Sequence, residues 1–585
     1  MQAPPPNVSA IRGGYDLHPV HRVPFGAIGQ GFEALAAALV DARTIRIDGY
    51  IGVDWEDFRR QLNEQFAALG RRPAWIDVSQ AWHSPAEIDR LVEPYLGGDD
   101  PLFGTRFPGT LHDFIDAHRW QNLRDEAVGE FAAYYGCGAA LVDAAGPVVY
   151  VDLPKDELQL RSREGRAGNL GVDEIAAAKE QYKRYYFVDW PILNRHKAEI
   201  MEQVNLIVDG QDEQSPSFLQ GDAFRTALDE LSRNVFRVRP WFAPGPWGGQ
   251  WLKQHVPAAP QDVPNYAWSF EIIAPENGIV LSDGGSTVEA TVDWLLYYRQ
   301  REVLGDCADR FGYEFPIRFD FLDTVDGGNL SVQCHPRPDY IREQFGETFT
   351  QDETYYILDC RPGAEVYLGF QAGVDPGEFR DALETSVRDA TPVDVERYVA
   401  VHPAAKHDLF LIPHGTIHCS GAGNLVLEIS ATPYIFTFKM YDWLRSDLDG
   451  KPRPLNIERA FDNLDFSRQG DLVAEDLICR PFVIDEGQDW RLVHLPTHRD
   501  HFYDVHRHEF DTAVEVETAG SPHVLMLVEG TRVTVETRHG VTQRFQYAET
   551  FVIPAAAESY RLINNGPERA MVVKAFIKPN AAPRS

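Results

Sequence analysis

Two patterns of hydrophobic and polar residues divide the chain near residue 237. Before it, segments with helical spacing alternate with short apolar runs. Strands that alternate with helices are typical of a parallel sheet covered by helices. We therefore predict an α/β domain over residues 30–236, after a flexible arm at 1–29 that is rich in Pro and Gly. The predicted helices are GFEALAAALVDA, DWEDFRRQLNEQFAAL, DELQLRSREGR and HKAEIMEQV, and the predicted strands are RTIRIDGY, AWIDVS, ALVDA, VVYVDLP and NLIVDG.

The second pattern begins after a stretch at 237–254 that is rich in Pro, Gly and Trp. Beyond it the chain consists mainly of short β-prone runs such as IRFDFLD, EVYLGF and HVLMLVEG, separated by Gly and Pro turns. Many evenly spaced short strands predict sandwich or barrel domains. We expect two of them in tandem, at 237–480 and 481–585, with one helical insert, DPGEFRDALETSV, in the first.

Composition narrows the range of partners and locations. The 585 residues carry a formal net charge of −33, which repels nucleic acid and anionic membranes, so we expect neither as a partner. The six cysteines form no CxxC pair, which suits a reducing compartment. Because the N-terminus has no apolar signal core and no apolar run reaches membrane-spanning length, the expected location is the cytoplasm. The oligomeric state is left open.

The stretch IRIDGYIGVDWEDF has the position of a phosphate-binding loop but lacks its chemistry. Gly49 and Gly52 are present, whereas the Lys that neutralises phosphate and the hydroxyl that holds Mg²⁺ are absent. Asp54 would oppose an anion at the start of the helix. With VVYVDLPKDELQLRSREGR and YYFVDWPILNRHKAEIMEQVNLIVDG, the layout resembles a uridine-kinase-like P-loop domain. The resemblance implies a degenerate pseudokinase module with a structural or regulatory role, and an active kinase is the alternative.

Candidate metal ligands begin in the stretch SVQCHPRPDY. Gln333 and His335 are two residues apart on a β-prone run, so their side chains point to one face. Alone, the pair is equally explained as a polar strand end. Glu353, before a strand, and His418, in the turn of IPHGTIHCSGAG, add an oxygen and a nitrogen donor. The four suit zinc, manganese or iron. A turn cap at Glu353 and a hydrogen-bonded barrel histidine at His418 are the alternatives.

The surrounding stretches resemble type I phosphomannose isomerases, which are metal-dependent cupins. The resemblance rests on NLSVQCHPRPDY, ETYYILD, AEVYLGF, PHGTIHCSGAGNLVLEIS and KMYDWLR, flanked by PWGGQWLK and PLNIERAFDNLD, over about residues 243–585. It implies two jelly-roll (cupin) barrels and interconversion of mannose 6-phosphate and fructose 6-phosphate through an enediolate. It also implies one Zn²⁺ per chain, with Mn²⁺ or Fe²⁺ as substitutes, at the positions of Gln333, His335, Glu353 and His418.

Two further residues are candidates for the chemistry of the reaction. Glu428, on the strand after the His418 turn, is a candidate general base, or a residue that holds a metal ligand in place. Lys439 stands where the family usually has Arg, and a cation there would stabilise the enediolate or hold phosphate. The alternative for Lys439 is a surface lysine on a strand.

The resemblance breaks where the substrate phosphate would bind. Asp320 and Gln351 stand where the family has lysines, and Tyr266 stands where it often has Glu. Losing two lysines weakens the binding of a phosphate dianion, and Asp320 is expected to repel it. The candidates to compensate are Arg318, Arg337 and Arg342.

Three functions therefore stay open. The first is a mannose-6-phosphate isomerase with relocated phosphate contacts, and it is the one we expect. The second is an isomerase of a non-phosphorylated sugar. The third is a catalytically altered sugar-binding regulator built from an inactive kinase and an inactive isomerase.

A rival histidine cluster lies in HRDHFYDVHRHEF. His506 and His508 form an H-x-H pair that would face one side of a strand, with Glu509 on the other side. His498 and His501 lie just before them. The alternatives are a second metal site and a solvated histidine-rich turn.

Overall fold

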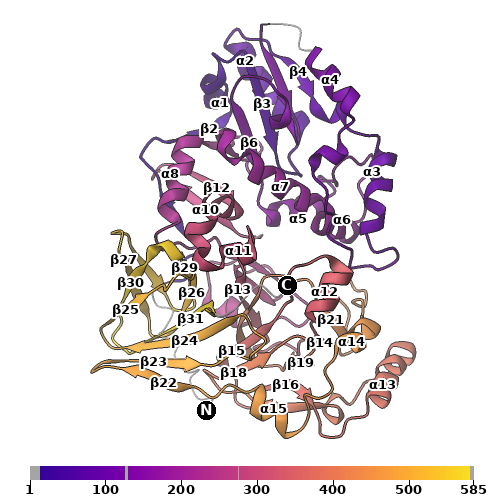
Figure 1. The fold of residues 1–585 in the computed structure, drawn as a ribbon, viewed down its shortest axis with the longest axis vertical. Coiled ribbons are helices and arrows are strands. Elements are labelled where there is room, and N and C mark those ends of the chain that lie inside the picture. Colours follow the sequence, from indigo (N-terminus) through magenta and orange to yellow (C-terminus); the bar gives the residue numbers. More distant parts are fainter. Residues whose placement is uncertain (1–13, 126–129, 275, 580–585) are drawn as a thin grey trace.

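The computed structural model describes residues 14–125, 130–274 and 276–579. Figure 1 shows the α/β domain at one end of the long axis and the β-rich parts at the other. We call residues 237–480 the first barrel and residues 481–585 the second barrel. Within the described ranges, no helix is both long and apolar enough to cross a membrane.

The predicted parallel α/β domain is present. Five strands run parallel in the order β4-β5-β3-β6-β7, and β8 and β2 add an antiparallel edge beside β7. Ile45, Ile47 and Val149 are fully buried with the apolar faces of α1 and α2. The strands are β2 (Ile28–Gln30), β3 (Thr44–Gly49), β4 (Ala74–Asp77), β5 (Ala132–Tyr135), β6 (Val148–Asp152), β7 (Val204–Asp209) and β8 (Ser217–Gln220), and the helices are α1 (Gly31–Leu39), α2 (Trp55–Ala68), α3 (Pro85–Val92), α4 (Ala117–Asp125), α5 (Lys155–Arg163), α6 (Ala178–Arg184), α7 (Trp190–Ile200) and α8 (Gly221–Leu231).

One predicted strand of this domain is wrong. Within ALVDA the chain forms a short 3₁₀ helix, Ala139–Leu141, in place of a strand. The Asp48 carboxylate accepts hydrogen bonds from the backbone N–H of Gly138 and Ala140, at 2.9 and 2.8 Å, which fixes a turn there. The strand at this place in the sheet is β5, whose four residues are all buried and show no alternation.

The described part of the predicted arm is built into the fold. Strand β1 (Val20–Arg22) pairs in parallel with β11 (Gly278–Ser282), and β2 pairs with β8. His21 Nε2 lies 2.8 Å from the carbonyl oxygen of Arg237. The expectation of a flexible arm is therefore wrong for these residues, because their backbone groups find partners far along the chain.

The first barrel consists of two antiparallel sheets with the orders β18-β15-β20-β13-β10-β9 and β17-β16-β19-β14-β21. The helical insert is confirmed as α13 (Pro376–Asp389). Its strands are β9 (Trp241–Ala243), β10 (Trp268–Ile272), β13 (Ile317–Asp323), β14 (Val332–Cys334), β15 (Glu353–Cys360), β16 (Glu365–Phe370), β17 (Val399–Pro403), β18 (Leu409–Ile412), β19 (His418–Ser420), β20 (Asn424–Ala431) and β21 (Phe438–Tyr441).

The first barrel region holds more helix than the one predicted insert. Helix α10 (Asp293–Leu304) buries Trp294, Leu295 and Leu296, and an apolar run of this length does not distinguish a helix from a buried strand. Strand β12 (Thr287–Thr291) precedes it and pairs with β11. The other helices are α9 (Trp251–His255), α11 (Ala308–Phe311), α12 (Pro338–Phe345), α14 (Ile457–Asn463) and α15 (Asp471–Asp476).

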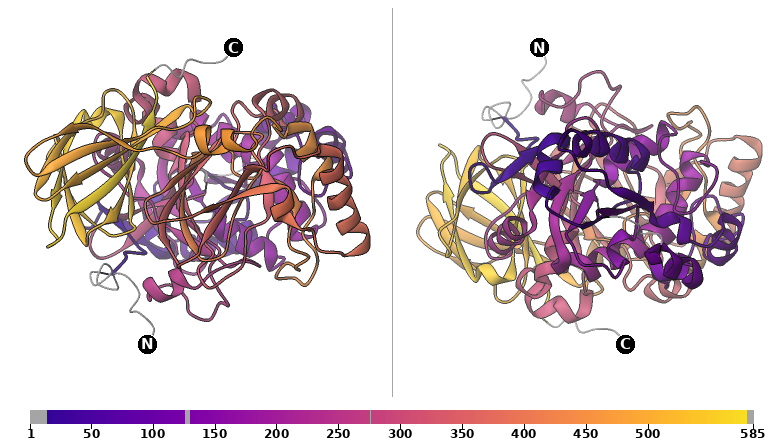
Figure 2. Two further views of the ribbon diagram at one scale, coloured as in Figure 1. Left: turned by 90° about the horizontal axis from the view of Figure 1, so that it is seen from below. Right: turned by 90° about the horizontal axis from the view of Figure 1, so that it is seen from above.

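The second barrel also has two facing sheets, with the orders β22-β23-β24-β31-β26-β29 and β25-β30-β27-β28. It lies beside the first barrel, as both views in Figure 2 show. The Tyr503 hydroxyl donates to the Ile429 carbonyl of the first barrel at 2.7 Å. Its strands are β22 (Phe482–Glu486), β23 (Trp490–Leu495), β24 (Tyr503–Phe510), β25 (Ala513–Glu517), β26 (His523–Glu529), β27 (Arg532–Thr537), β28 (Thr542–Gln546), β29 (Thr550–Ile553), β30 (Ser559–Asn564) and β31 (Ala570–Ile577).

Candidate metal centre

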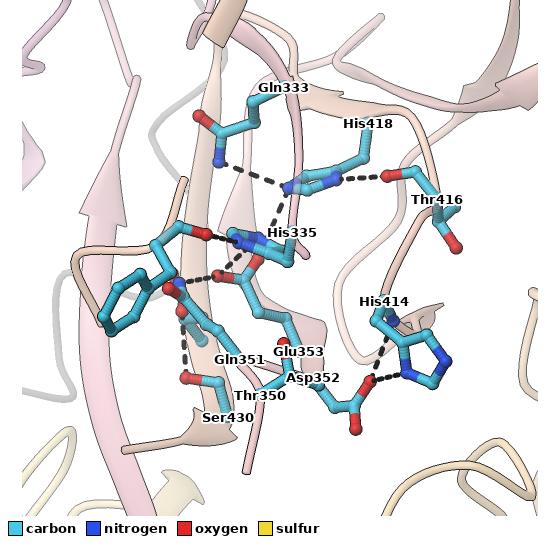
Figure 3. A network of polar contacts seen from close by, with 12 residues as sticks. Gln333, His335, Thr350, Gln351, Asp352, Glu353, His414, Thr416, His418 and Ser430 are labelled. Carbon is cyan, nitrogen blue, oxygen red and sulfur yellow. Dashed lines mark hydrogen bonds and ion pairs between the residues drawn. The ribbon is translucent and has the colours of Figure 1, made fainter. Parts of the chain in front are cut away.

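Three strands of the first barrel bring the four predicted ligands together. Gln333 on β14 pairs directly with His418, the first residue of β19. Glu353 is the first residue of β15, and His335 follows the last residue of β14. All four side chains are buried and lie close to one another in Figure 3.

Both imidazoles are oriented by their Nδ1 atoms. Nδ1 of His335 lies 3.0 Å from the Phe436 carbonyl oxygen, and Nδ1 of His418 lies 2.9 Å from the Thr416 carbonyl oxygen. Since a carbonyl can only accept, each Nδ1 carries the proton and each Nε2 keeps its lone pair. Histidines that bind metals are commonly held in this way.

The two Nε2 atoms converge on one carboxylate. His335 Nε2 lies 3.0 Å from Glu353 Oε1, and His418 Nε2 lies 3.4 Å from Glu353 Oε2. One ligand atom from each of the three residues lies within 4.8 Å of the others. His335 Nε2 and Glu353 Oε2 are buried and have no hydrogen-bond partner in the part of the chain that the structure describes, and such atoms call for an explanation. With the amide of Gln333, 3.2 Å from His418 Nε2, these donors fit a divalent cation.

The charge states of the cluster suit a cation. Burial lowers the pKa of His418, which keeps its imidazole neutral. Burial opposes ionisation of Glu353, but the neighbouring His335 and His418 hold the pKa of this carboxyl well below its usual range. The site therefore offers an ionised oxygen ligand beside the two imidazoles.

The Arg318 guanidinium contacts three acidic residues, one of which is the proposed ligand Glu353. Its Nη2 forms an ion pair with Glu428 and lies 3.5 Å from Glu353, and its Nε lies 3.5 Å from Asp320. Burial raises the pKa of Asp320 to about 7, although Arg318 opposes the shift, and burial also raises the pKa of Glu428 well above its usual value. Asp320 is thus paired and partly protonated, which weakens the repulsion of phosphate expected from the sequence.

The two other departures from the family pattern have local partners. The Gln351 amide donates to Glu353 Oε1 and so helps to orient the carboxylate. The Tyr266 hydroxyl donates to the Pro260 carbonyl at 2.7 Å.

Lys439 lies in the site and is not a surface lysine. It pairs with Gln333 across β14 and β21, and it is half-buried. Burial, reinforced by nearby Arg453, lowers the pKa of Lys439 to about 8. Within the described ranges its ammonium has no hydrogen bond or ion pair, so it is free to contact a substrate.

A cavity of about 610 Å³ opens above the ligands and is lined by Gln333, Glu353, Glu428 and Lys439. Its opposite wall belongs to the α/β domain, from α5, α6 and the loop at 101–103. Of the three arginines expected to compensate for the lost lysines, Arg318 lines the cavity, whereas Arg337 and Arg342 are exposed and do not. Arg337 donates to the Asp462 carbonyl. The cations that line it are Arg163, Lys179 and Lys183 from the α/β domain, and Arg318, Lys439 and Arg453 from the first barrel.

The cations of the α/β domain were not identified from the sequence. Arg163 lies within the predicted helix DELQLRSREGR and is the last residue of α5, and nothing in its local pattern distinguishes it from a solvated helix end. Lys179 forms an ion pair with Asp449 at 3.0 Å, and Lys183 donates to the Asp100 carbonyl at 2.7 Å. Arg163 has no ion pair with any other described residue. Only the packing of the two domains places it at the cavity.

The rival histidines take different positions. His506 lies near His494 and Asp504, and one possible ligand atom from each of the three lies within 4.8 Å of the others. Glu509 lies on the other face of the strand and pairs with Arg491. His508 is buried, and its Nε2 has no hydrogen-bond partner. His498 and His501 are buried too, so the alternative of a solvated turn is wrong.

A family model covers most of the α/β domain. Residues 31–233 match a family described as a domain of unknown function (DUF8485). Part of the chain is homologous to mannose-6-phosphate isomerases. It is 29% identical to mannose-6-phosphate isomerase ManA of Bacillus subtilis over 224 residues. The match covers 38% of this chain and 66% of that protein. It is 30% identical over 219 residues to the enzyme of Streptococcus mutans, covering 37% and 64%.

The matches thus span just under two thirds of these relatives' own length. Among solved structures, the mannose 6-phosphate isomerase of Bacillus subtilis aligns with 59% of this chain and 99% of that one, at 20% identity and a TM-score of 0.48.

Proposed function

We propose that this chain is a metal-dependent isomerase that interconverts mannose 6-phosphate and fructose 6-phosphate. The observation that carries the proposal is the buried set of Gln333, His335, Glu353 and His418, in which the Nε2 atoms of both histidines face one carboxylate. Homology to mannose-6-phosphate isomerases supports the choice of substrate. The proposed ion is one Zn²⁺ per chain, because imidazole and carboxylate are its usual ligands together with water.

These four residues would hold the ion, with Gln351 orienting Glu353. When bound, Zn²⁺ acts as a Lewis acid on the sugar oxygens and stabilises the negative charge that develops on them. Lys439, whose ammonium has no competing ion pair among the described residues, adds a positive charge beside the same oxygens.

We assign the transfer of the proton to Glu428. From aldose to ketose, the C2–H bond breaks and its proton passes to the Glu428 carboxylate, while the electron pair forms the C1=C2 bond and charge moves to the C1 oxygen. The proton then returns to C1, and the proton of the O2 hydroxyl moves to O1. Burial raises the pKa of Glu428, which lets it hold the proton between the two steps, and Arg318 and Ser430 keep it in place.

We assign the phosphoryl group to the cations that line the cavity, above all Arg163. A guanidinium without a competing ion pair can form a bidentate contact with phosphate. Arg163→Ala should raise KM for mannose 6-phosphate about 10-fold, the cost of roughly one charged hydrogen bond, and leave kcat nearly unchanged. Arg166→Ala is the matched control, because Arg166 pairs with Glu164 and Glu213 outside the cavity lining. Equal effects of the two substitutions would contradict the assignment.

We propose that the N-terminal domain is a degenerate kinase-like module that covers this cavity and transfers no phosphate. At the start of α2, where a phosphate loop would bind its anion, Asp54 caps the helix by accepting from the Asp57 N–H at 3.0 Å. A carboxylate there excludes phosphate by charge. Incubation with ATP and a panel of nucleosides should give no phosphoryl transfer, and clear transfer would overturn this part of the proposal.

The deciding experiment combines metal analysis of the purified protein with coupled isomerase assays on mannose 6-phosphate, fructose 6-phosphate and free mannose. Bound zinc with turnover of the phosphorylated sugars is expected. Turnover of free mannose alone would favour an isomerase of non-phosphorylated sugars. Bound metal without any turnover would favour a sugar-binding regulator.

A further inference from the structure

A second cavity, of about 410 Å³, lies between the α/β domain and the segment that leads into the first barrel. One wall is α7 with Lys155 at the start of α5, and the other includes α10 and Tyr434. Figure 1 shows α7 and α10 where these two parts of the molecule meet. The volume is in the range of small-molecule sites.

The cavity lies at the carboxyl ends of the parallel strands. Lys155 follows β6 after a two-residue turn, and Tyr50 follows β3 directly. The Lys155 ammonium lies 5.5 Å from the centre of the Tyr50 ring. Open α/β sheets bind their ligands at this edge. The cavity therefore lies where such sheets bind ligands, although the Lys and the hydroxyl of a phosphate-binding loop are absent from the same domain.

Lys155 is the feature that calls for a ligand. Its side chain is 1% exposed, and its Nζ atom has no hydrogen-bond partner among the described residues. The closest carboxylate oxygen, Oδ2 of Asp293, is 3.9 Å away. A buried ammonium carries three donors, and leaving them unpaired is costly. An acceptor atom inside the cavity would satisfy them.

Three acidic residues of the cavity lining are paired within the protein, whereas Glu199 is exposed and Arg195 donates to the Gly109 and Phe107 carbonyls. Asp293 pairs with Lys197 at 3.0 Å, and Lys197 also pairs with Asp152 at 3.1 Å. Arg106 forms ion pairs with Glu314 and Glu347, at 2.5 and 3.5 Å. A ligand with a net charge would upset this balance, whereas a neutral ligand with hydroxyl groups would not.

Aromatic rings and amide or hydroxyl groups complete the lining. Asn194 accepts from the Tyr50 hydroxyl at 3.1 Å through its oxygen, which leaves its NH₂ group as a donor. The Tyr297 hydroxyl donates to Asp293 at 3.2 Å. The aromatic residues that line the cavity are Tyr186, Trp190, Tyr297, Tyr313, Phe349 and Tyr434. Flat apolar walls with a few fixed polar groups suit a ring that carries hydroxyls on its edge.

We propose that this cavity binds a neutral, hydroxylated ring, either a free sugar or the ribose of a nucleoside, whose oxygens accept from Lys155. This site shares Tyr434 with the cavity of the candidate metal centre but includes none of the proposed ligands, and it does not depend on the isomerase proposed above.

The test is calorimetric titration of the metal-loaded full chain with D-mannose, D-fructose, uridine and adenosine. The sugars and the nucleosides distinguish the two sources of the ring. We expect one of them to bind, with a Kd raised at least 10-fold by Lys155→Met. Because Lys155 is buried, its replacement can destabilise the fold. Ala198→Trp, which fills the cavity from α7 and removes no polar group, should weaken binding equally.

The variant His418→Ala distinguishes binding in this cavity from binding at the candidate metal centre. Binding that persists in His418→Ala and is lost in Ala198→Trp supports the proposal. Binding that is lost in His418→Ala but persists in both cavity variants belongs to the metal centre and overturns it. Absence of binding by all four probes overturns it too.

Discussion

The two barrels each consist of two sheets and are both rich in histidine, but the partners of their histidine side chains differ. In the first barrel, the Nδ1 atoms of His335 and His418 are held by backbone carbonyls, and both Nε2 atoms face Glu353. In the second, His494 Nε2 is already paired with Asp504 at 2.9 Å, and His506 pairs across the sheet with Lys574. The comparison teaches that histidine content is a weak guide to a metal site, and that a fixed tautomer and a shared carboxylate are the stronger signs.

The largest expected effect comes from removing one ligand from each barrel. His418→Ala should reduce bound metal from about one equivalent per chain to a trace and lower isomerase activity by more than about 100-fold, since the open site loses an imidazole ligand. His506→Ala is the matched control and should keep both the bound metal and the isomerase activity. Metal analysis and the coupled assay measure the effect. Loss of metal from the His506 variant, with retention in the His418 variant, would move the site to the second barrel.

A smaller effect is expected at Lys439, the free ammonium beside Gln333. Lys439→Ala should lower kcat about 100-fold, comparable with the loss of one preorganised donor to a developing oxyanion. Its pKa of about 8 implies that the cation is present below this pH and lost above it, so activity should fall as pH rises through about 8. Lys439→Arg should keep activity and remove this alkaline limb, and an unchanged limb would contradict the role.

The smallest effect concerns stability of the second barrel in mild acid. Burial lowers the pKa of His506 to about 4 and that of His508 and His523 well below its usual value. These groups are neutral when folded and bind protons when unfolded, so stability is present above about pH 6.5 and falls as pH decreases, by up to about 1.4 kcal/mol per pH unit for each histidine.

Urea unfolding between pH 7.5 and 5.5 measures this slope. His508→Leu, which replaces a histidine with an unpaired Nε2 by a side chain of similar size, should reduce the slope without loss of stability at pH 7.5. A variant with the slope of the wild type would show that His508 is not among the titrating groups.

The sequence predicted most of the elements and most of the residues that gather at the candidate metal centre. Periodicity gave the α/β layering, the two β-rich parts and the helix at α13, and the family-like stretches pointed to Gln333, His335, Glu353 and His418, which the fold brings together. It failed at ALVDA and at β5, where hydrogen bonds to Asp48 and full burial override local pattern.

The tertiary structure decided what surrounds those residues. Lys439 is a cavity residue because β21 pairs with β14, and Arg318 reaches Glu428 because β13 pairs with β20. Arg163 reaches the same cavity because the α/β domain packs over the barrel, and Lys155 is enclosed by α7 and α10. Contacts between domains leave no periodic signal in a chain, since the partners lie hundreds of residues apart, so only the folded molecule could bring these charges together.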